Sequence, residues 1–323
     1  MDKLVSRNIS LTILLVIVLA MVLLFRNRTP FGKDQVSFSS APQKEITRIE
    51  FSKEDEKLTL AKKGDTWVVN GLKEARPGAI SFIERILAEI RIKSPVAPEL
   101  FQQEVVNKKI NPVRVKAYGN SKLLTSFLVY KTGSNIYGNI MKIKENSKPF
   151  IVSVPGYEGD IGSAFTLNEL FWLPYVVFNL LPSEIRSVSF ENVADPSSSF
   201  KIQGSNKTYT LSNGSLNLTG WDSSRVRRYL SYFTLIPFES WAFDLPEHEA
   251  DSIQSTRPLY RIDVIKSDGT GIMLSLWEKM NNETGEKDSD RLWGKTDSGN
   301  ALFIMRYFDI DPLLKKRSYF YNQ

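Results

Sequence analysis

The chain has 323 residues, of which 42% are hydrophobic and 24% are charged, and these proportions exclude both a disordered chain and a protein with many membrane spans. It contains no cysteine, which excludes disulfides, cysteine-ligated zinc, thiol catalysis and a lipid anchor attached to cysteine. The formal net charge is +6, but acidic and basic residues alternate along most of the chain and the basic clusters are small, so we expect no nucleic-acid partner.

The N-terminal region contains a continuous apolar run. Residues 9–25 read ISLTILLVIVLAMVLLF and carry no charge. As a helix rising about 1.5 Å per residue, this run spans roughly 25 Å, near the short end of the transmembrane range. Small residues in a cleavage-like pattern occur only at Ser39 and Ala41, far behind the run, which favours an uncleaved anchor over a signal peptide. We therefore predict a short cytoplasmic head at residues 1–8, a transmembrane helix at 9–25 and a linker at 26–44.

The orientation of the anchor follows from the length of its flanks. Lys3 and Arg7 precede the span, and Arg26, Arg28 and Lys33 follow it, so the flanking positive charges are nearly balanced. The head before the span is short and stays in the cytoplasm easily. The three positive charges after the span are too few to hold the large C-terminal domain in the cytoplasm. We expect a single-pass protein of the bacterial inner membrane with its main domain in the periplasm or outside the cell.

The residues after the linker predict a first α+β repeat, at 45–160. Alternation in ITRIEFS, KLTLA and TWVV predicts three strands, and Gly64-Asp65 predicts a hairpin turn between the last two. Apolar residues at helical spacing from Ile80 to Ile90 predict an amphipathic helix that begins near Pro77. The runs VRVKAYG, LLTSFLVY, NIYGNIMKI and PFIVSV then predict an antiparallel meander.

The same order of elements recurs at residues 185–323. IRSVSFE resembles ITRIEFS, YRIDVIK resembles VRVKAYG, and IMLSLWEK resembles LLTSFLVYK. Val226, Tyr229, Leu230 and Phe233 repeat the apolar stripe of the first helix. The offset grows along the chain, as loop insertions would produce. We predict an internal duplication, with two similar β-rich halves that each contain antiparallel strands and one amphipathic helix; the alternative is two unrelated runs of strands and helices.

An apolar connector at residues 161–184 joins the predicted halves. Its centre reads LFWLPYVVFNLL, and exposed apolar clusters of this size are unusual. One hypothesis is that Phe171, Trp172, Tyr175 and Phe178 dock a partner or a membrane surface. The alternative, which we prefer, is a connector buried between the halves.

This layout resembles the domain of unknown function 4340 family. The resemblance rests on ITRIEFSKEDEKLTLAKKGDTWVVNG, on the helix ISFIERILAEIRI and on the strand pair VRVKAYGNSKLLTSFLVYK. It implies a bacterial envelope protein with an N-terminal membrane helix and, as a partner, components of gliding-type ABC transport. It implies no catalytic residue. Lys131 and Gly133 match only part of the family pattern after the second strand, so no site is transferred.

The sequence predicts no catalytic residue, cofactor site or metal site. The single histidine, His248, lies in PEHEAD, which lacks the HExxH spacing and which we interpret as a solvated acidic loop. Residues 294–296, Gly-Lys-Thr, resemble the end of a phosphate loop, but the glycine required at 289 is a serine, so we predict a strand and turn there. Asp309 and Asp311 precede Pro312, where carboxylates cap turns or face solvent.

The leading functional hypothesis is an anchored extracytoplasmic accessory or scaffold protein in a membrane complex. It would bind a protein partner or an envelope component, in association with an ABC-type transport system. Two alternatives stay open: an envelope hydrolase, such as a carbohydrate-active enzyme with distant paired carboxylates, and a small-ligand-binding protein that uses a groove between the repeats.

Overall fold

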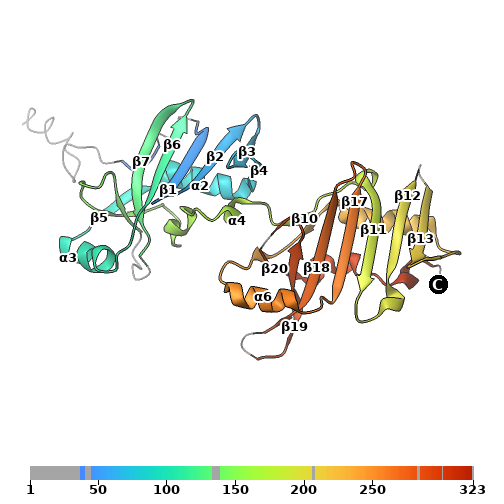
Figure 1. The fold of residues 1–323 in the computed structure, drawn as a ribbon. Helices are drawn as coiled ribbons and strands as arrows, with labels where there is room; N and C mark the ends of the chain where they lie inside the picture. The colour runs from blue at the N-terminus through green and yellow to red at the C-terminus, as the bar shows by residue number, and fades with distance from the viewer. Residues whose placement is uncertain are drawn as a thin grey trace, which may run out of the picture. The chain divides into compact units, whose positions relative to one another are not determined.

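The computed structural model of the protein describes residues 37–40, 45–132, 139–205, 208–281, 284–299 and 301–321. These residues form two compact units that divide the chain between Leu173 and Pro174. Each unit consists of an antiparallel β-sheet with a few helices packed against it (Figure 1). The predicted α+β class with antiparallel strands is therefore confirmed.

The predicted transmembrane helix at 9–25 lies outside the described residues, as does most of the predicted linker. Within the described ranges, no helix combines the length and apolar content that crossing a membrane requires.

The first unit contains a nine-stranded sheet in the order β4-β3-β2-β1-β6-β7-β8-β9-β5. Its strands are β1 Arg48–Lys53, β2 Glu56–Lys63, β3 Thr66–Val69, β4 Lys73–Glu74, β5 Arg91–Pro95, β6 Val113–Gly119, β7 Lys122–Tyr130, β8 Asn139–Lys142 and β9 Phe150–Ser153. Its helices are α2 Pro77–Glu89, α3 Pro98–Phe101 with a wider turn η1 Gln102–Val106, and α4 Glu169–Trp172, and a 3-10 turn spans Ile161–Ala164.

The second unit contains another nine-stranded sheet, in the order β14-β13-β12-β11-β17-β18-β19-β20-β16. Its strands are β11 Ile185–Asn192, β12 Phe200–Ser205, β13 Thr208–Asn213, β14 Leu216–Asn217, β16 Ser240–Trp241, β17 Tyr260–Lys266, β18 Gly271–Met280, β19 Lys287–Thr296 and β20 Phe303–Arg306. A separate strand pair joins β10 Val176–Phe178 to β15 Ile236–Pro237. Its helices are α5 Ser223–Ser231, α6 Glu247–Ser255 and α7 Tyr307–Ile310, with 3-10 turns at Pro182–Glu184, Pro196–Ser198, Tyr232–Thr234, Asp311–Leu313 and Arg317–Phe320.

The two sheets have the same strand order when their strands are read in chain order. Their registers also correspond: Phe51 of β1 lies opposite Val115 of β6, and Phe190 of β11 lies opposite Ile262 of β17. The predicted recurrence of strands is therefore confirmed. The correspondence allows each residue of one sheet to be compared with its structural equivalent in the other.

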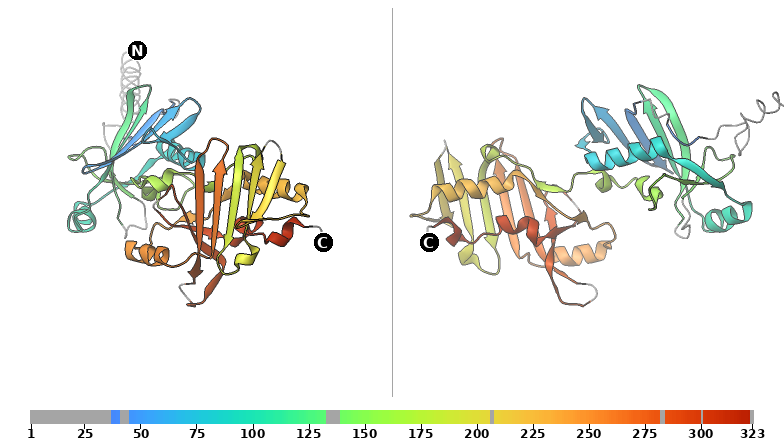
Figure 2. Two further views of the ribbon diagram at one scale, coloured as in Figure 1. Left: turned by 45° about the vertical axis from the view of Figure 1, so that its right-hand side comes forward. Right: turned by 180° about the vertical axis from the view of Figure 1, so that it is seen from behind.

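A helix covers the core face of each sheet (Figure 2). In α2, the stripe of buried residues that includes Ile83 and Leu87 packs against the first sheet, as the periodicity predicts. In α5, Val226, Tyr229 and Leu230 pack against the second. The Tyr229 ring is fully buried, and its hydroxyl donates to the Leu313 carbonyl at 2.9 Å, so this polar group is satisfied inside the core.

Each unit also contains helical segments besides the predicted amphipathic helix, so the prediction of one helix per half is wrong. They are α3 with η1, and α4, in the first unit, and α6 and α7 in the second. The segment around His248, interpreted above as a loop, is the first turn of α6. The sequence pattern of α6 is weak because the helix buries no residue completely. The acidic residues in its first turn stabilise it by their interaction with the positive end of the helix dipole.

Candidate functional site

The structure divides the four predicted docking residues between two hydrophobic cores. Trp172 is fully buried in the first unit and stacks on Phe51, with ring centroids 5.4 Å apart. Phe178 is fully buried in the second unit. Both rings fill the core of their own unit, so they are not exposed docking residues. Burial of the connector between the halves stays a prediction. Phe171 and Tyr175 are partly buried against the same two cores, and a docking role for these two stays a prediction.

The other motifs considered in the sequence lie apart from one another. Residues 294–296 are inside strand β19, not at a helix start. Asp309 pairs with Arg306 at 2.8 Å, and Asp311 pairs with Lys315 at 2.7 Å. These two carboxylates therefore have local structural partners.

His248 is exposed on α6 together with Glu247, Glu249 and Asp251. Within the described ranges, no group of three or more histidine, aspartate or glutamate side chains is placed to hold a metal ion.

The outer face of the first sheet, opposite α2, is closed by a small second core. Tyr130, Ile140 and Ile151 lie in a row across β7, β8 and β9, and their exposed fractions are only 7%, 0% and 8%. The segment α3–η1 covers this row: Val105 is buried against it, and the Phe101 ring packs edge-on against Tyr130 at 5.3 Å. The row is therefore sealed from solvent.

The equivalent row in the second sheet is Trp277, Trp293 and Ile304 on β18, β19 and β20. Helix α6 covers only its first member: Trp277 is 7% exposed and donates from its indole nitrogen to the Thr256 carbonyl at 3.0 Å. Trp293 and Ile304 are only partly buried. The layer that is closed in the first unit is thus open in the second.

A groove of about 690 Å³ lies at this open layer. Its lining residues come from α6, from the strands β18 to β20 and from the segment before α6; Figure 1 labels α6 and these three strands. We call it the aromatic groove. It is lined by the segment 240–246, by Glu249 and Ile253 of α6, and by Glu278, Met280, Trp293 and Ile304 of the sheet. Phe243 and Met280 at the groove are unusually exposed for large apolar residues, at 42% and 48%. This combination of concavity and exposed apolar surface is typical of a binding site.

The residues that line the aromatic groove carry an excess of negative charge. Lys279 places its ammonium 5.2 Å from the centre of the Trp293 ring and pairs with Asp288. Asp244, Glu249 and Glu278 contribute carboxylates, and none of the described residues that line the groove is basic. Lys287 pairs with Glu278 at 2.6 Å, which leaves the other two carboxylates in excess. The groove therefore favours a ligand that is apolar at its centre and positively charged at its margins.

Sequence reasoning missed this groove, although one signal was present. The segment 240–246 reads SWAFDLP and places two aromatic residues next to an acid just before α6. Trp293 was interpreted only as part of a strand. Nothing in the local pattern connects these segments, because their proximity depends on the pairing of β16 with β20 at the sheet edge.

A comparison with models of known protein families finds no match to this chain, and a search of curated proteins finds none either.

Proposed function

We propose that this chain is a membrane-anchored accessory or scaffold protein of the bacterial envelope, and that its extracytoplasmic domain binds a protein partner within a transport-associated membrane complex. The aromatic groove is the observation that carries this proposal. The first unit seals the same layer with its own residues, whereas the second leaves it open. The apolar layer on the outer face of the second sheet is therefore accessible, and a partner can bind there.

The groove lining defines the chemistry of that partner. Trp293, Ile304 and Phe243 provide apolar and aromatic surface, and such residues dominate the energetics of protein interfaces. Asp244 and Glu249 add negative charge at the same site. The partner segment is therefore one that carries apolar side chains flanked by lysine or arginine.

The proposed membrane attachment rests on the uncharged run at residues 9–25. Protease treatment of intact cells tests it directly. The domain should be cut from outside once the outer layers are opened, and a chain lacking residues 1–28 should leave the membrane fraction. Retention of the shortened chain in the membrane would contradict the anchor.

Partner binding is tested by pull-down of the full-length chain from native membranes in a mild detergent. Wild-type chain should recover one stoichiometric partner, and Phe243→Asp and Trp293→Ala should lose most of it. Leu216→Asp is a matched control, because Leu216 is also an exposed apolar residue, at 63%, but lies on β14 at the far edge of the same sheet.

Two results would count against the proposed function. One is repeated recovery of the chain alone, with no stoichiometric partner. The other is equal loss of the partner in Phe243→Asp and Leu216→Asp, since that would place the contact outside the aromatic groove. Circular dichroism of each variant shows that lost binding does not reflect lost folding.

A carbohydrate ligand is the second candidate, because the aromatic groove combines the exposed Phe243 ring and two partly buried tryptophan rings with three carboxylates. Sugar-binding sites use the same residue types. Titration of soluble envelope glycan fragments against wild-type and Trp293→Ala chains distinguishes this candidate: saturable binding that the substitution abolishes, with no protein partner recovered, would favour it.

A further inference from the structure

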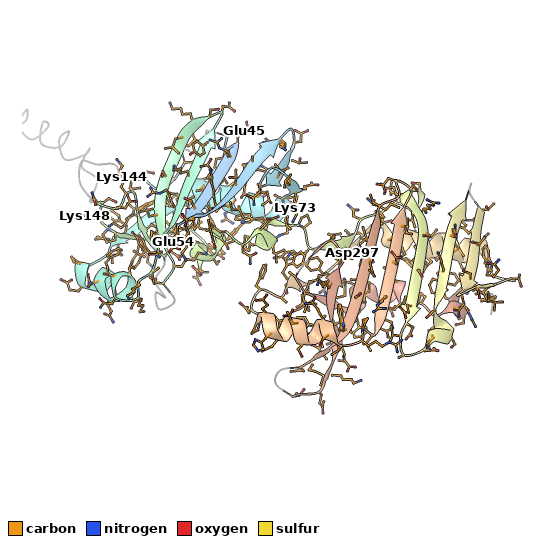
Figure 3. The ribbon with its side chains drawn as sticks, in the orientation of Figure 1. Glu45, Glu54, Lys73, Lys144, Lys148 and Asp297 are labelled. Atoms are coloured by element: carbon orange, nitrogen blue, oxygen red, sulfur yellow. The ribbon has the colours of Figure 1, made fainter. Side chains whose placement is uncertain are left out.

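Three lysines gather at one end of the first sheet. Lys53 ends β1, Lys131 follows β7, and Lys109 follows η1. All three line a second groove, of about 540 Å³, which we call the lysine groove. Asn111, also in its lining, donates to the Glu54 carboxylate, and Figure 3 shows Glu54 at the opposite end of the sheet from Glu45.

None of these three ammonium groups forms an ion pair with a carboxylate of the described residues. In the part of the chain that the structure describes, no carboxylate lies within 4.0 Å of Lys53, Lys109 or Lys131. Glu56 is the one acidic residue among the described residues of the lining. A concave surface with excess charge of one sign concentrates the field and attracts counter-ions.

The uncharged side chains of the lysine groove supply hydrogen-bond donors. The Asn168 side-chain oxygen accepts from the Leu170 backbone at 3.0 Å, which leaves its amide N–H groups for other partners. The Thr166 hydroxyl oxygen accepts from the Asn168 backbone at 3.1 Å, which leaves its O–H to donate. Both side chains are thus held in place by the local backbone and keep donors unused.

Lys131 is held in an environment that disfavours its own charge. Its side chain keeps an exposed surface, but protein atoms surround it along the groove wall. Burial lowers the pKa of Lys131, the charge of Asp160 opposes this effect, and the charge of Lys53 adds to it. A bound anion would offset both the cost of burying the Lys131 charge and the repulsion between the two lysines, because an opposite charge nearby favours the charged form.

The second unit shows that the fold does not require these lysines. The strand register matches Val129 of the first unit with Leu276 of the second, so the residue equivalent to Lys131 is Glu278. It also matches Phe51 with Phe190, so the residue equivalent to Lys53 is Asn192. Asn192 uses its side-chain oxygen to accept from the backbone of its own turn. The same strand order is therefore built with an acidic and an uncharged residue at the positions of Lys131 and Lys53.

We propose that the lysine groove is a binding site for a phosphate group, carried either by a soluble phosphate ester or by an anionic lipid headgroup. Lysine binds phosphate as a compact point charge, and three ammonium groups in one groove lining, together with neutral donors, are the kinds of group that phosphate oxygens accept hydrogen bonds from.

The test uses full-length chain in a non-ionic detergent and inorganic phosphate as the first probe. The unfolding midpoint is measured against phosphate concentration at constant ionic strength, since a ligand that binds only the folded state raises it. Lys131→Gln and Lys53→Gln should each weaken phosphate binding by at least about tenfold, as expected for loss of a charged contact. Lys122→Gln should not, because Lys122 is an exposed lysine at the opposite end of β7.

A second probe, glycerol phosphate, and bilayers of phosphatidylglycerol or phosphatidylcholine separate the two sources. A lipid headgroup is identified by two results together. Glycerol phosphate binds more strongly than inorganic phosphate, and Lys131 is protected from amine labelling by phosphatidylglycerol bilayers but not by phosphatidylcholine bilayers. Equal binding of both phosphates without such protection identifies a soluble ligand. No stabilisation beyond that of matched sodium chloride, or an equal loss in Lys122→Gln, would overturn the site.

Discussion

Lys131 shows how a single residue can reduce the stability of the fold. Burial lowers the pKa of this lysine in the folded chain, so the charged form is penalised on folding. The positive charge of Lys131 thus lowers the stability of the fold, and the equivalent position of the second unit carries no positive charge. A residue that destabilises the fold in this way is typically kept for function.

Lys131→Gln is therefore expected to raise the free energy of unfolding in the absence of any anion. Because solvent screens a side chain that keeps an exposed surface, the gain should not exceed about 0.5 kcal/mol. A lysine with a lowered folded pKa is destabilising below that pKa, and the penalty disappears as the pH rises towards the unfolded value of about 10.4. The advantage of Lys131→Gln over wild type should thus be largest near neutral pH and shrink in alkali.

Thermal unfolding at several pH values measures this difference, with Lys122→Gln as the reference. A destabilised Lys131→Gln at neutral pH would show that the lysine supports the fold and would contradict the assigned penalty.

At the scale of single residues, the sequence predicted burial better than it predicted sites. The apolar stripe of α2 and the alternation of β1 identified core positions such as Ile83 and Phe51 correctly, because burial repeats with the period of the element. Lys53, Lys109 and Lys131 are far apart in the chain and share no periodic pattern. Lys53 and Lys131 reach the same end of the sheet only because β1 pairs with β6 and β6 pairs with β7.

At the scale of elements, α6 determines whether the aromatic groove exists. The helix has no fully buried residue, and a few contacts near its C-terminal end hold it to the sheet. Trp277 donates to Thr256 just after the helix, and Lys295 donates to the Gln254 side chain. Loss of these contacts should loosen the helix without unfolding the sheet below it.

Trp277→Phe removes the indole donor and part of the ring. We expect a loss of about 1–2 kcal/mol, from one hydrogen bond and a reduced packing volume. Hydrogen exchange should increase mainly in residues 247–255. The matched control is Tyr130→Phe at the equivalent position of the first unit, where the hydroxyl has no hydrogen-bond partner among the described residues and the ring itself packs on Phe101.

Tyr130→Phe should leave exchange in α3 nearly unchanged. Unchanged protection of α6 in Trp277→Phe would show that other contacts hold this helix, and the aromatic groove would then be more rigid than its contacts indicate.

The elements that escaped sequence prediction have a physical reason in common. Two-residue strands such as β4, β14 and β16 are too short to display a period, and they exist because a neighbouring strand offers its free edge. Helices α3 and α6 cover only a few residues of the outer face, so their apolar stripes are incomplete. Long strands and α2 were predictable because each carries several turns or alternations of the same pattern.

At the scale of the whole molecule, the two hydrophobic cores contain no residue in common. Trp172 is the last buried residue of the first core, and Phe178 is the first of the second, although only a short stretch of chain separates them. An apolar segment that looked continuous in the sequence is thus divided between two folding units. Burial was predictable from its composition, whereas the division depended on which sheet each ring reached.

This division predicts that core substitutions act on one unit at a time. Trp172→Ala and Phe178→Ala each remove a fully buried ring and should cost about 3–5 kcal/mol. Hydrogen exchange followed by mass spectrometry should show faster exchange in residues 46–172 for Trp172→Ala and in residues 178–320 for Phe178→Ala. Each variant is the control for the other. If either substitution accelerates exchange equally in both ranges, the two cores unfold cooperatively, and the aromatic and lysine grooves would then depend on one shared stability rather than on two.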